Sequence, residues 1–195
     1  FFSKQDFLIT NLAMAVSLAI LLKPKINLKN INKLSTPKGR FEKIQVFSNK
    51  YCIIDYAHTP SAIETVLKDI KKNFTGSIIS IFGCGGNRDK GKRSKMGKIV
   101  EKFSDQILIT TDNPRFEDPI DIYKDITSGI SNRKKTSFIP DREKAIKEGL
   151  KILSRQKKDS VLLIAGKGHE NYQEVKGERF PLNDIKILKG LISVN

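Results

Sequence analysis

From Lys43 onward, short apolar runs alternate with longer helix-like segments. Strands are predicted at 43–47, 51–55, 77–82, 106–110, 137–139 and 160–165, and helices at 61–72, 95–103, 119–130, 141–154 and from residue 183 onward. The strand-like runs are continuously apolar rather than alternating, which is typical of strands buried on both faces. The pattern therefore predicts an α/β fold, a Rossmann-like open sheet with helices on both faces.

The segment before this alternation has a different pattern. Residues Leu8–Leu22 are apolar on most sides and predict a helix that is buried against a partner. The segment is short for a bilayer and contains three polar residues, so we expect neither a membrane span nor a signal peptide. A polar linker follows. We expect two parts, residues 1–36 and 37–195, in a chain that starts inside a larger protein.

The composition suits a globular domain with a strong positive charge. Of 195 residues, 38% are hydrophobic and 29% are charged, and the net charge is +15. A basic face could bind nucleic acid or another anion such as a nucleotide. The lysines are spread through all segments rather than gathered in one stripe, so we favour a charge scattered over the surface and expect no nucleic-acid partner.

The two cysteines, Cys52 and Cys84, have neither metal-ligand spacing nor a partner motif. Cys52 lies in an apolar run, where a small buried thiol is expected, and the two cysteines fit a reduced, cytoplasmic setting without a disulfide framework.

Polar or glycine-rich segments follow four of the predicted strands. They are Asp55–Pro60 (DYAHTP), Gly83–Arg88 (GCGGNR), Asp112–Arg115 (DNPR) and Gly166–Glu170 (GKGHE). Ligands of open α/β sheets bind at the carboxyl ends of the strands. We therefore expect the four segments to meet at one edge of the sheet and to form a binding site.

The glycine-rich segment has two interpretations. Gly86–Lys92 fits most of the ATP-binding pattern GxxxxGK[ST], but Arg93 stands where a hydroxyl would hold Mg²⁺. Unobstructed backbone amides would let an anion approach, and Arg88 adds a planar guanidinium suited to a carboxylate. The glycines alone favour the alternative, a tight strand-to-helix turn with solvated basic residues.

The DNPR segment places an acid, an amide and a guanidinium within four residues, stiffened by proline. Such groups could bind the ammonium and the carboxylate of an amino acid together. An Asx-type turn that caps the helix at Pro119 is an equally good interpretation.

The other two segments are also ambiguous. In GKGHE, the glutamate could pair with a ligand ammonium, whereas a lone histidine such as His169 more often makes structural hydrogen bonds. In DYAH, the carboxylate could bind ribose hydroxyls, and an aromatic or imidazole ring could flank a base. The alternative is a helix start with Thr59 as cap and Pro60 in the first turn.

Taken together, GRFE, DYAHTP, FGCGGNRDKGKR, TTDNPRFEDP and AGKGHENYQ resemble, in the same order, the carboxy-terminal domain of the Mur ligases. These are ATP-dependent amino-acid ligases of peptidoglycan synthesis, the pathway that builds the cell wall. The resemblance covers nearly the whole chain and is nearest to members that add meso-2,6-diaminopimelate. It implies that 37–195 are the carboxy-terminal domain and that 1–36 are the end of the central ATPase domain with a linker.

The resemblance implies a reaction. meso-Diaminopimelate would be ligated to the D-glutamate of UDP-N-acetylmuramoyl-L-alanyl-D-glutamate through an acyl phosphate, with ATP and Mg²⁺ bound mainly by the central domain. The catalytic residues and the metal ligands would lie upstream, so we expect no catalytic residue and no metal site within this chain, and no ligase activity from it alone. The complete enzyme would be cytoplasmic and monomeric.

The resemblance also implies binding residues. Those for diaminopimelate are Arg88, Asp112, Asn113, Pro114, Arg115, Gly166 and Glu170, and those on the ATP side are Arg40, Asp55 and His58. Arg115 would pair with the distal carboxylate, which lysine lacks. The glycine loop is then an amino-acid carboxylate loop, and its match to the ATP-binding pattern is accidental.

Other functions remain open. The chain could belong to a lysine-adding ligase or to one like folylpolyglutamate synthetase, which share the sheet. It could also be a non-catalytic basic domain that binds polyanions, which salt-sensitive binding would indicate.

Overall fold

The computed structural model describes residues 6–22, 29 and 36–193. The chain divides into two compact units, Phe1–Pro37 and Lys38–Asn195. The first contains helix α1 (Asp6–Leu22), which confirms the predicted helix. Its predicted burial is not observed in this chain, because Leu18, Leu21 and Leu22 are 58%, 80% and 75% exposed. Among the described residues, no helix has both the length and the apolar character to cross a membrane.

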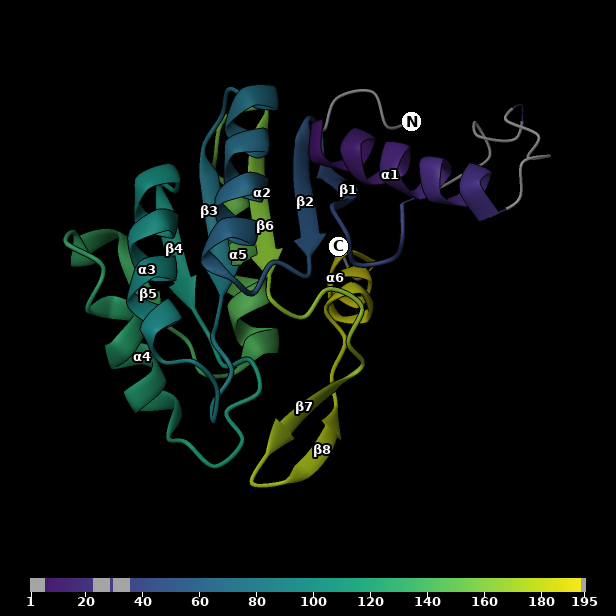
Figure 1. Cartoon of the computed structure of the whole chain (residues 1–195). Coiled ribbons are helices and arrows are strands. Elements are labelled where there is room, and N and C mark those ends of the chain that lie inside the picture. The colour runs from purple at the N-terminus through teal and green to yellow at the C-terminus, as the bar shows by residue number, and fades with distance from the viewer. Residues whose placement is uncertain (1–5, 23–28, 30–35, 194–195) are drawn as a thin grey trace. The chain divides into compact units, whose positions relative to one another are not determined.

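The second unit is built on a six-stranded sheet with the order β1-β2-β6-β3-β4-β5 (Figure 1). Its strands are β1 (Glu42–Phe47), β2 (Lys50–Asp55), β3 (Ile78–Phe82), β4 (Gln106–Ile109), β5 (Thr136–Phe138) and β6 (Ser160–Ala165). The neighbouring strands β2, β6, β3, β4 and β5 pair in parallel, and β1 pairs antiparallel with β2. Strands were predicted at all six places.

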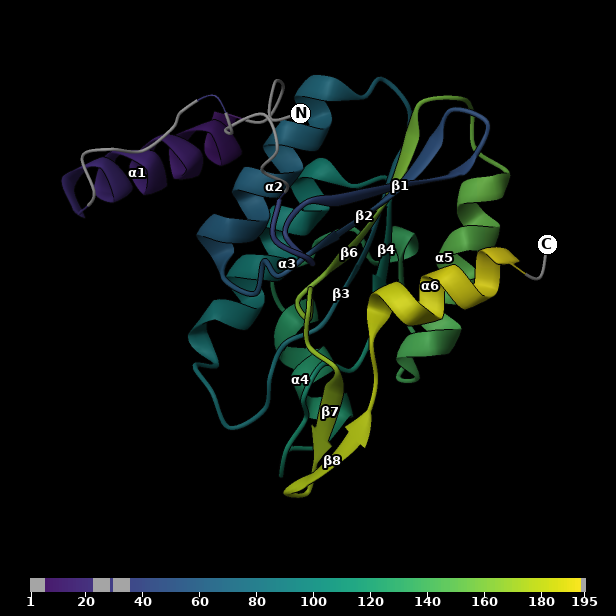
Figure 2. The same ribbon diagram turned by 90° about the vertical axis from the view of Figure 1, so that its right-hand side faces the viewer.

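Helices cover both faces of this sheet, as predicted (Figure 2). On one face lie α2 (Pro60–Asn73), α3 (Gly91–Phe103) and α4 (Pro119–Thr127), and on the other lie α5 (Arg142–Ser154) and α6 (Asp184–Ser193). A short 3-10 helix, η2 (Arg133–Lys135), precedes β5. The central strands β3 and β6 are buried along their whole length, which is why their sequences are continuously apolar.

Capping side chains mark the starts of α2, α4 and α5, among other helices. Thr59 accepts from the amide of Ala62 at the start of α2, as one interpretation of DYAHTP predicted. Asp141 caps α5 in the same way. The cap of α4 is Asp118, which accepts from Ile120, so the interpretation of DNPR as the cap of this helix is wrong.

A hairpin outside the main sheet was not predicted. It consists of β7 (Tyr172–Val175) and β8 (Glu178–Pro181), joined at Lys176 and Gly177, which both have positive φ angles (50° and 85°). Two positive φ angles in a row are typical of the tight turns that close two-residue hairpins. The residues of β8 are all exposed, so the hairpin lacks the apolar run that revealed the other strands.

A buried ion pair joins α5, α6 and the end of β6. Arg142 Nε lies 2.7 Å from Asp184 Oδ1, and Arg142 Nη2 donates to Asp184 Oδ2 at 2.8 Å and to the carbonyl of Ala165 at 3.0 Å. Both side chains are 0% exposed. Charges so deeply buried are tolerated only when they are paired and hydrogen-bonded.

A second buried arginine explains the failed ATP-binding pattern. Arg93 is 0% exposed and donates to both carboxylate oxygens of Glu117, at 2.8 and 3.0 Å, and to Asp125 at 2.8 Å. It also donates to the carbonyl of Gly85 at 3.1 Å. The position that would carry the Mg²⁺-binding hydroxyl therefore holds a guanidinium that ties α3 to α4 and to the glycine loop.

Replacing Arg142 with methionine should lower the free energy of unfolding by about 3–5 kcal/mol, because it leaves the Asp184 carboxylate buried without its partner. The double variant Arg142→Met, Asp184→Leu should recover most of that loss, since no uncompensated charge remains. Urea denaturation of the chain measures both. As a control, Lys124→Ala breaks the exposed pair with Asp121 and should cost at most about 1 kcal/mol. A loss in Arg142→Met no larger than the control's would contradict the expectation.

The stability should also fall at acidic pH because of Glu117. Hydrogen bonds from Arg93 lower the pKa of Glu117 from 4.5 to about 2. A carboxyl group whose pKa is lower in the folded state stabilises the fold above its unfolded pKa, and this contribution is lost as the pH falls. The free energy of unfolding should therefore decrease between about pH 4.5 and about pH 2.

The variant Glu117→Gln tests this by urea denaturation at a series of pH values. It should be less stable at neutral pH by about 1.5–3 kcal/mol and should lose less stability on acidification. Glu178→Gln, which changes an exposed carboxylate of β8, should keep the acid sensitivity of the unmodified chain. Equal acid sensitivity in Glu117→Gln would count against the assignment.

Candidate functional site

The four strand-end segments do meet at one edge of the sheet. They follow β2, β6, β3 and β4, which are adjacent in this order and run parallel. Their carboxyl ends therefore lie side by side, as the sequence predicted. Two groups of side chains result, one around Tyr56 and one around Asn113.

Asp55 anchors the group around Tyr56. Its carboxylate is buried and accepts from the amides of Phe41, at 2.8 Å, and Ala57, at 2.7 Å. Burial raises the pKa of Asp55, although these amides and the Arg40 guanidinium favour its charged form. The carboxylate thus ties the GRFE segment to the end of β2 and places Arg40 at the site.

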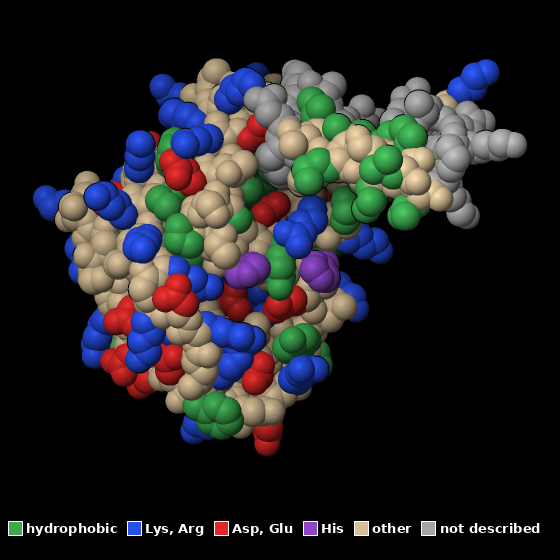
Figure 3. All heavy atoms as spheres, viewed as in Figure 1, with side chains coloured by type: hydrophobic (Ala, Val, Ile, Leu, Met, Phe, Trp, Pro, Cys, Tyr) green, Lys and Arg blue, Asp and Glu red, His purple; other side chains and the backbone are tan. Residues whose placement is uncertain are grey.

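Tyr56 lies between Arg40 and the chain's two histidines. The Arg40 guanidinium is 4.5 Å from the centre of the Tyr56 ring, and the rings of His58 and His169 are 4.6 and 5.2 Å from it. Figure 3 shows both histidines exposed on one face, with a hydrophobic side chain between them. Burial raises the pKa of Tyr56, and the nearby carboxylate of Glu170 raises it further. Tyr56 therefore links its own group to Glu170 in the group around Asn113.

The glycines of the loop after β3 serve close packing. A Cβ atom on Gly86 would lie 1.9 Å from the carbonyl oxygen of Pro114, so only glycine fits there. The amide of Gly86 donates to the Asn113 carbonyl at 2.8 Å, and its carbonyl accepts from Arg115 Nη1 at 2.9 Å. The glycine loop and the DNPR segment therefore form one packed unit.

Two arginines flank the same glycine of this loop. A Cβ atom on Gly85 would lie 3.0 Å from Nη1 of Arg115 and 3.7 Å from Cγ of Arg88. Arg88 is exposed, and among the described residues none forms a hydrogen bond or an ion pair with its side chain. The Arg115 guanidinium beside a residue without a side chain, with the exposed Arg88 side chain starting nearby, suits the binding of a carboxylate.

The unpredicted hairpin positions Arg115. The Arg115 amide donates to the carbonyl of Glu174 at 3.0 Å, and the Arg115 carbonyl accepts from Lys176 at 2.7 Å. These bonds hold Arg115 in a left-handed conformation, with a φ angle of 52°. Its Nε lies 3.2 Å from Glu174 Oε2, and its side chain is 18% exposed. The guanidinium is thus oriented by the hairpin and remains partly accessible.

The acidic and amide groups meet around Lys167, a residue to which the sequence had given no role. Lys167 Nζ lies 2.9 Å from Glu170 Oε2, 3.1 Å from Asn113 Oδ1 and 3.9 Å from Asp112 Oδ1. Asn113 Nδ2 also donates to Glu170 Oε2 at 3.1 Å. With Glu174 and Arg115, the cluster holds three carboxylates and two cations, which leaves one net negative charge. Such a balance favours a ligand with an ammonium group.

The side chain of Asp112 lies close to the backbone of Gly166. Its φ angle is 114°, and a Cβ atom there would lie 2.8 Å from Asp112 Oδ2. The predicted residues Asp112, Asn113, Arg115, Gly166 and Glu170 are therefore close together, and Pro114 packs beside them on Gly86.

Among the described residues, no group of side chains is suited to hold a metal ion. Groups of three or more His, Cys, Asp or Glu that could hold an ion are absent from the described residues. On the face shown in Figure 3, lysines and arginines are interspersed with acidic residues.

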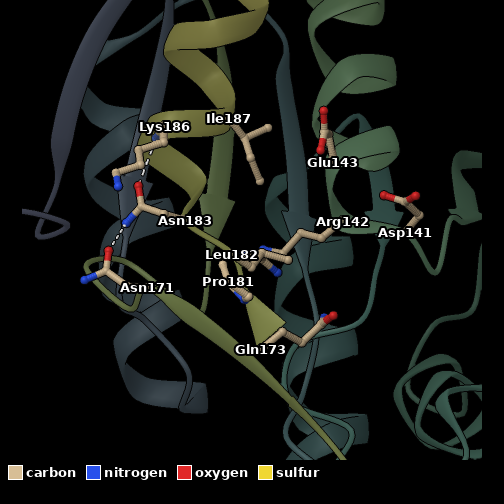
Figure 4. A pocket seen from close by; sticks show the side chains of 10 residues that line it. All are labelled: Asp141, Arg142, Glu143, Asn171, Gln173, Pro181, Leu182, Asn183, Lys186 and Ile187. Atoms are coloured by element: carbon tan, nitrogen blue, oxygen red, sulfur yellow. Dashed lines mark hydrogen bonds between the residues drawn. The ribbon is translucent and has the colours of Figure 1, made fainter. Parts of the chain in front are cut away.

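A pocket of about 470 Å³ lies between the hairpin, the start of α5 and the start of α6 (Figure 4). It is lined by Asp141, Arg142, Glu143, Asn171, Gln173, Pro181, Leu182, Asn183, Lys186 and Ile187, none of which was predicted as a site residue. Gln173 links it to the site, because its side-chain amide donates to the carbonyls of Thr111 and Asp112. The pocket thus borders the cluster around Lys167 without containing it.

Relatives of known name resemble this chain over most of its length. The UDP-N-acetylmuramoyl-L-alanyl-D-glutamate–2,6-diaminopimelate ligase of Aquifex aeolicus is 44% identical over 190 residues, which is 96% of this chain and 38% of that protein. A solved structure of a ligase of the same name superposes with a TM-score of 0.73 at 34% identity, over 96% of this chain and 37% of the other. This chain therefore spans somewhat more than a third of the length of these relatives.

More distant proteins share the fold alone. A Mycobacterium tuberculosis folylpolyglutamate synthase superposes with a TM-score of 0.58 at 15% identity, over 73% of this chain and 33% of that one. The family described as "Mur ligase, glutamate ligase domain" matches residues 39–168, two thirds of the chain. This range includes three of the strand-end segments and the first three residues of the fourth. The chain therefore belongs to the Mur ligase family.

Proposed function

We propose that the chain is the acceptor-binding part of an ATP-dependent ligase that joins meso-2,6-diaminopimelate to the D-glutamate of UDP-N-acetylmuramoyl-L-alanyl-D-glutamate. The observation that carries the proposal is the placement of Arg115, with Arg88 across Gly85, beside the negatively charged cluster around Glu170. An amino acid needs adjacent cationic and anionic groups of this kind. The name of the Aquifex aeolicus relative, at 44% identity, supports the choice of substrate.

Arg115 would select diaminopimelate over lysine. Its guanidinium would form a charge-assisted pair with the distal carboxylate of diaminopimelate, with Asp112, Asn113 and Pro114 holding the loop in place. Lysine has no such carboxylate and would leave the guanidinium without its partner, at a cost of about 2–5 kcal/mol. Arg88 would bind a carboxylate of the same ligand.

Gly166 and Glu170 would hold an ammonium group of the acceptor. The absence of a side chain at Gly166 leaves the Asp112 carboxylate close to the backbone. Glu170 remains ionised, because the hydrogen bond and the charge of Lys167 outweigh the effect of burial and lower its pKa.

The group around Tyr56 fits a nucleotide. A guanidinium stacked on an aromatic ring, with two imidazole rings nearby, offers a flat surface and a positive charge. We assign Arg40, Asp55 and His58 to the ATP side of the site, with Asp55 acting through the backbone amides that it holds. Bound ATP, with Mg²⁺, would supply the phosphoryl group that activates the glutamate carboxylate. This chain would orient the acceptor and exclude water.

The remaining assignments follow from the family. Residues 1–36 would be the end of the central ATPase domain with its linker, and 37–195 the carboxy-terminal domain. The exposed apolar side chains of α1 support this assignment, because a helix of this kind needs a partner. We place the complete enzyme in the cytoplasm as a monomer, with its catalytic groups outside this chain.

Calorimetric titration of the purified chain with meso-diaminopimelate tests the proposal. We expect saturable binding, at least about tenfold weaker binding of L-lysine, and loss of diaminopimelate binding in Arg115→Ala, because the carboxylate pair is worth more than 1.4 kcal/mol. The matched control is Arg155→Ala, an arginine beyond the end of α5, which should bind as the unmodified chain does.

Equal affinity for lysine would overturn the role of Arg115 and favour a lysine-adding ligase. Salt-sensitive binding to a polyanion such as heparin, unchanged in Arg115→Ala, would favour a basic binding domain.

A further inference from the structure

Lys167 is buried at the centre of the site. Its side chain is 0% exposed, and its ammonium lies among the side chains of Asp112, Asn113 and Glu170. A buried ammonium loses its hydration and persists only when oxygen acceptors replace the water. All three partners belong to the proposed acceptor-binding residues, whereas Lys167 itself faces no solvent. It therefore does not contact a ligand directly and can orient one only through these neighbours.

The ammonium is one of three groups that orient the Asn113 amide. Asn113 Oδ1 accepts from Lys167 Nζ at 3.1 Å and from the amide of Glu174 at 2.9 Å, and Nδ2 donates to Glu170 Oε2 at 3.1 Å. The flipped amide would turn its NH₂ group toward two donors and its oxygen toward a carboxylate. The orientation seen here is consequently the one that satisfies every group.

The same ammonium holds Glu170. Lys167 Nζ and Asn113 Nδ2 both contact Oε2, so the two contacts fix the rotation of the carboxylate. Burial raises the pKa of Glu170, but Lys167 and Asn113 more than offset it and lower the pKa overall. The carboxylate is thus kept both oriented and charged before any ligand arrives.

We propose that Lys167 is a positioning residue, which fixes the Asn113 amide and the Glu170 carboxylate in the orientation that receives the amino-acid acceptor. The proposal rests on the proposed function for the identity of the ligand. The ordering of the two side chains needs no ligand, so it can be tested separately. Preorganisation of this kind improves affinity because the binding groups lose less freedom when the ligand binds.

The first experiment is NMR of the ligand-free chain, comparing Lys167→Met with Lys98→Met, which removes the same charge from an exposed position of α3. In the unmodified chain and in Lys98→Met, the Asn113 side-chain amide should give one set of slowly exchanging signals. In Lys167→Met, that amide should exchange faster or give two sets, and the pKa of Glu170 should rise. An ordered amide and an unchanged Glu170 pKa in a folded Lys167→Met chain would overturn the proposal.

The second experiment is the titration with meso-diaminopimelate. Lys167→Met should bind at least about tenfold more weakly than Lys98→Met, and undiminished affinity would overturn the proposal. If the unmodified chain does not bind diaminopimelate, the proposed function fails, and the ligand-free NMR still decides the role of Lys167.

If Lys167→Met does not fold, the NMR signals of the Asn113 side chain in the unmodified chain test the proposal instead. Two sets of Asn113 side-chain signals, one for each amide orientation, would overturn the proposal, and a single protected set would support it.

Discussion

The parallel pairing of β2, β6, β3 and β4 is the constraint on which the rest of the site depends. Strands that run in the same direction end at the same edge, so the segments that follow them are brought together although they are up to 111 residues apart, from Asp55 to Gly166. The pairing is stabilised by the burial of β3 and β6 on both faces, and each buried Ile or Leu contributes about 1.5–3 kcal/mol. The groups proposed to bind the acceptor can therefore be polar, because the sheet beneath them supplies the stability.

Close approach of the loops is the second requirement. Gly86 lies against the Pro114 carbonyl, and Gly39 approaches the amide of His169 so closely that a Cβ atom would lie 2.2 Å away. The contact at Gly86 agrees with the interpretation of its loop as a tight turn, which the glycines alone had favoured over an anion-binding loop. Here they let one loop pack directly on the next, and the guanidinium and carboxylate groups are brought together as a result.

The pairing of buried charges is the third requirement. Arg93 and Arg142 are fully enclosed and each has a carboxylate partner, so they lock the loops to the helices behind them. Lys167 differs from them because its partners belong to the proposed binding residues. The same physical rule, that a buried charge must be matched, therefore serves the scaffold in two places and the site in a third.

The sequence by itself determined the α/β class, the places of the six strands of the main sheet and the meeting of four polar or glycine-rich segments at the carboxyl ends of four of them. Continuous apolar runs and the segments that follow them are local patterns, and they can be recognised without knowing the tertiary contacts. Only the tertiary structure revealed the hairpin, because its strands are mostly polar and its Lys176-Gly177 turn was the sole local signal. Only the tertiary structure could assign the charged groups as well. Arg93 meets Glu117 and Asp125 across 24 and 32 residues, and Lys167 meets Asn113 across 54. Whether a charged side chain is solvated or buried depends on these distant partners, and no local pattern records them.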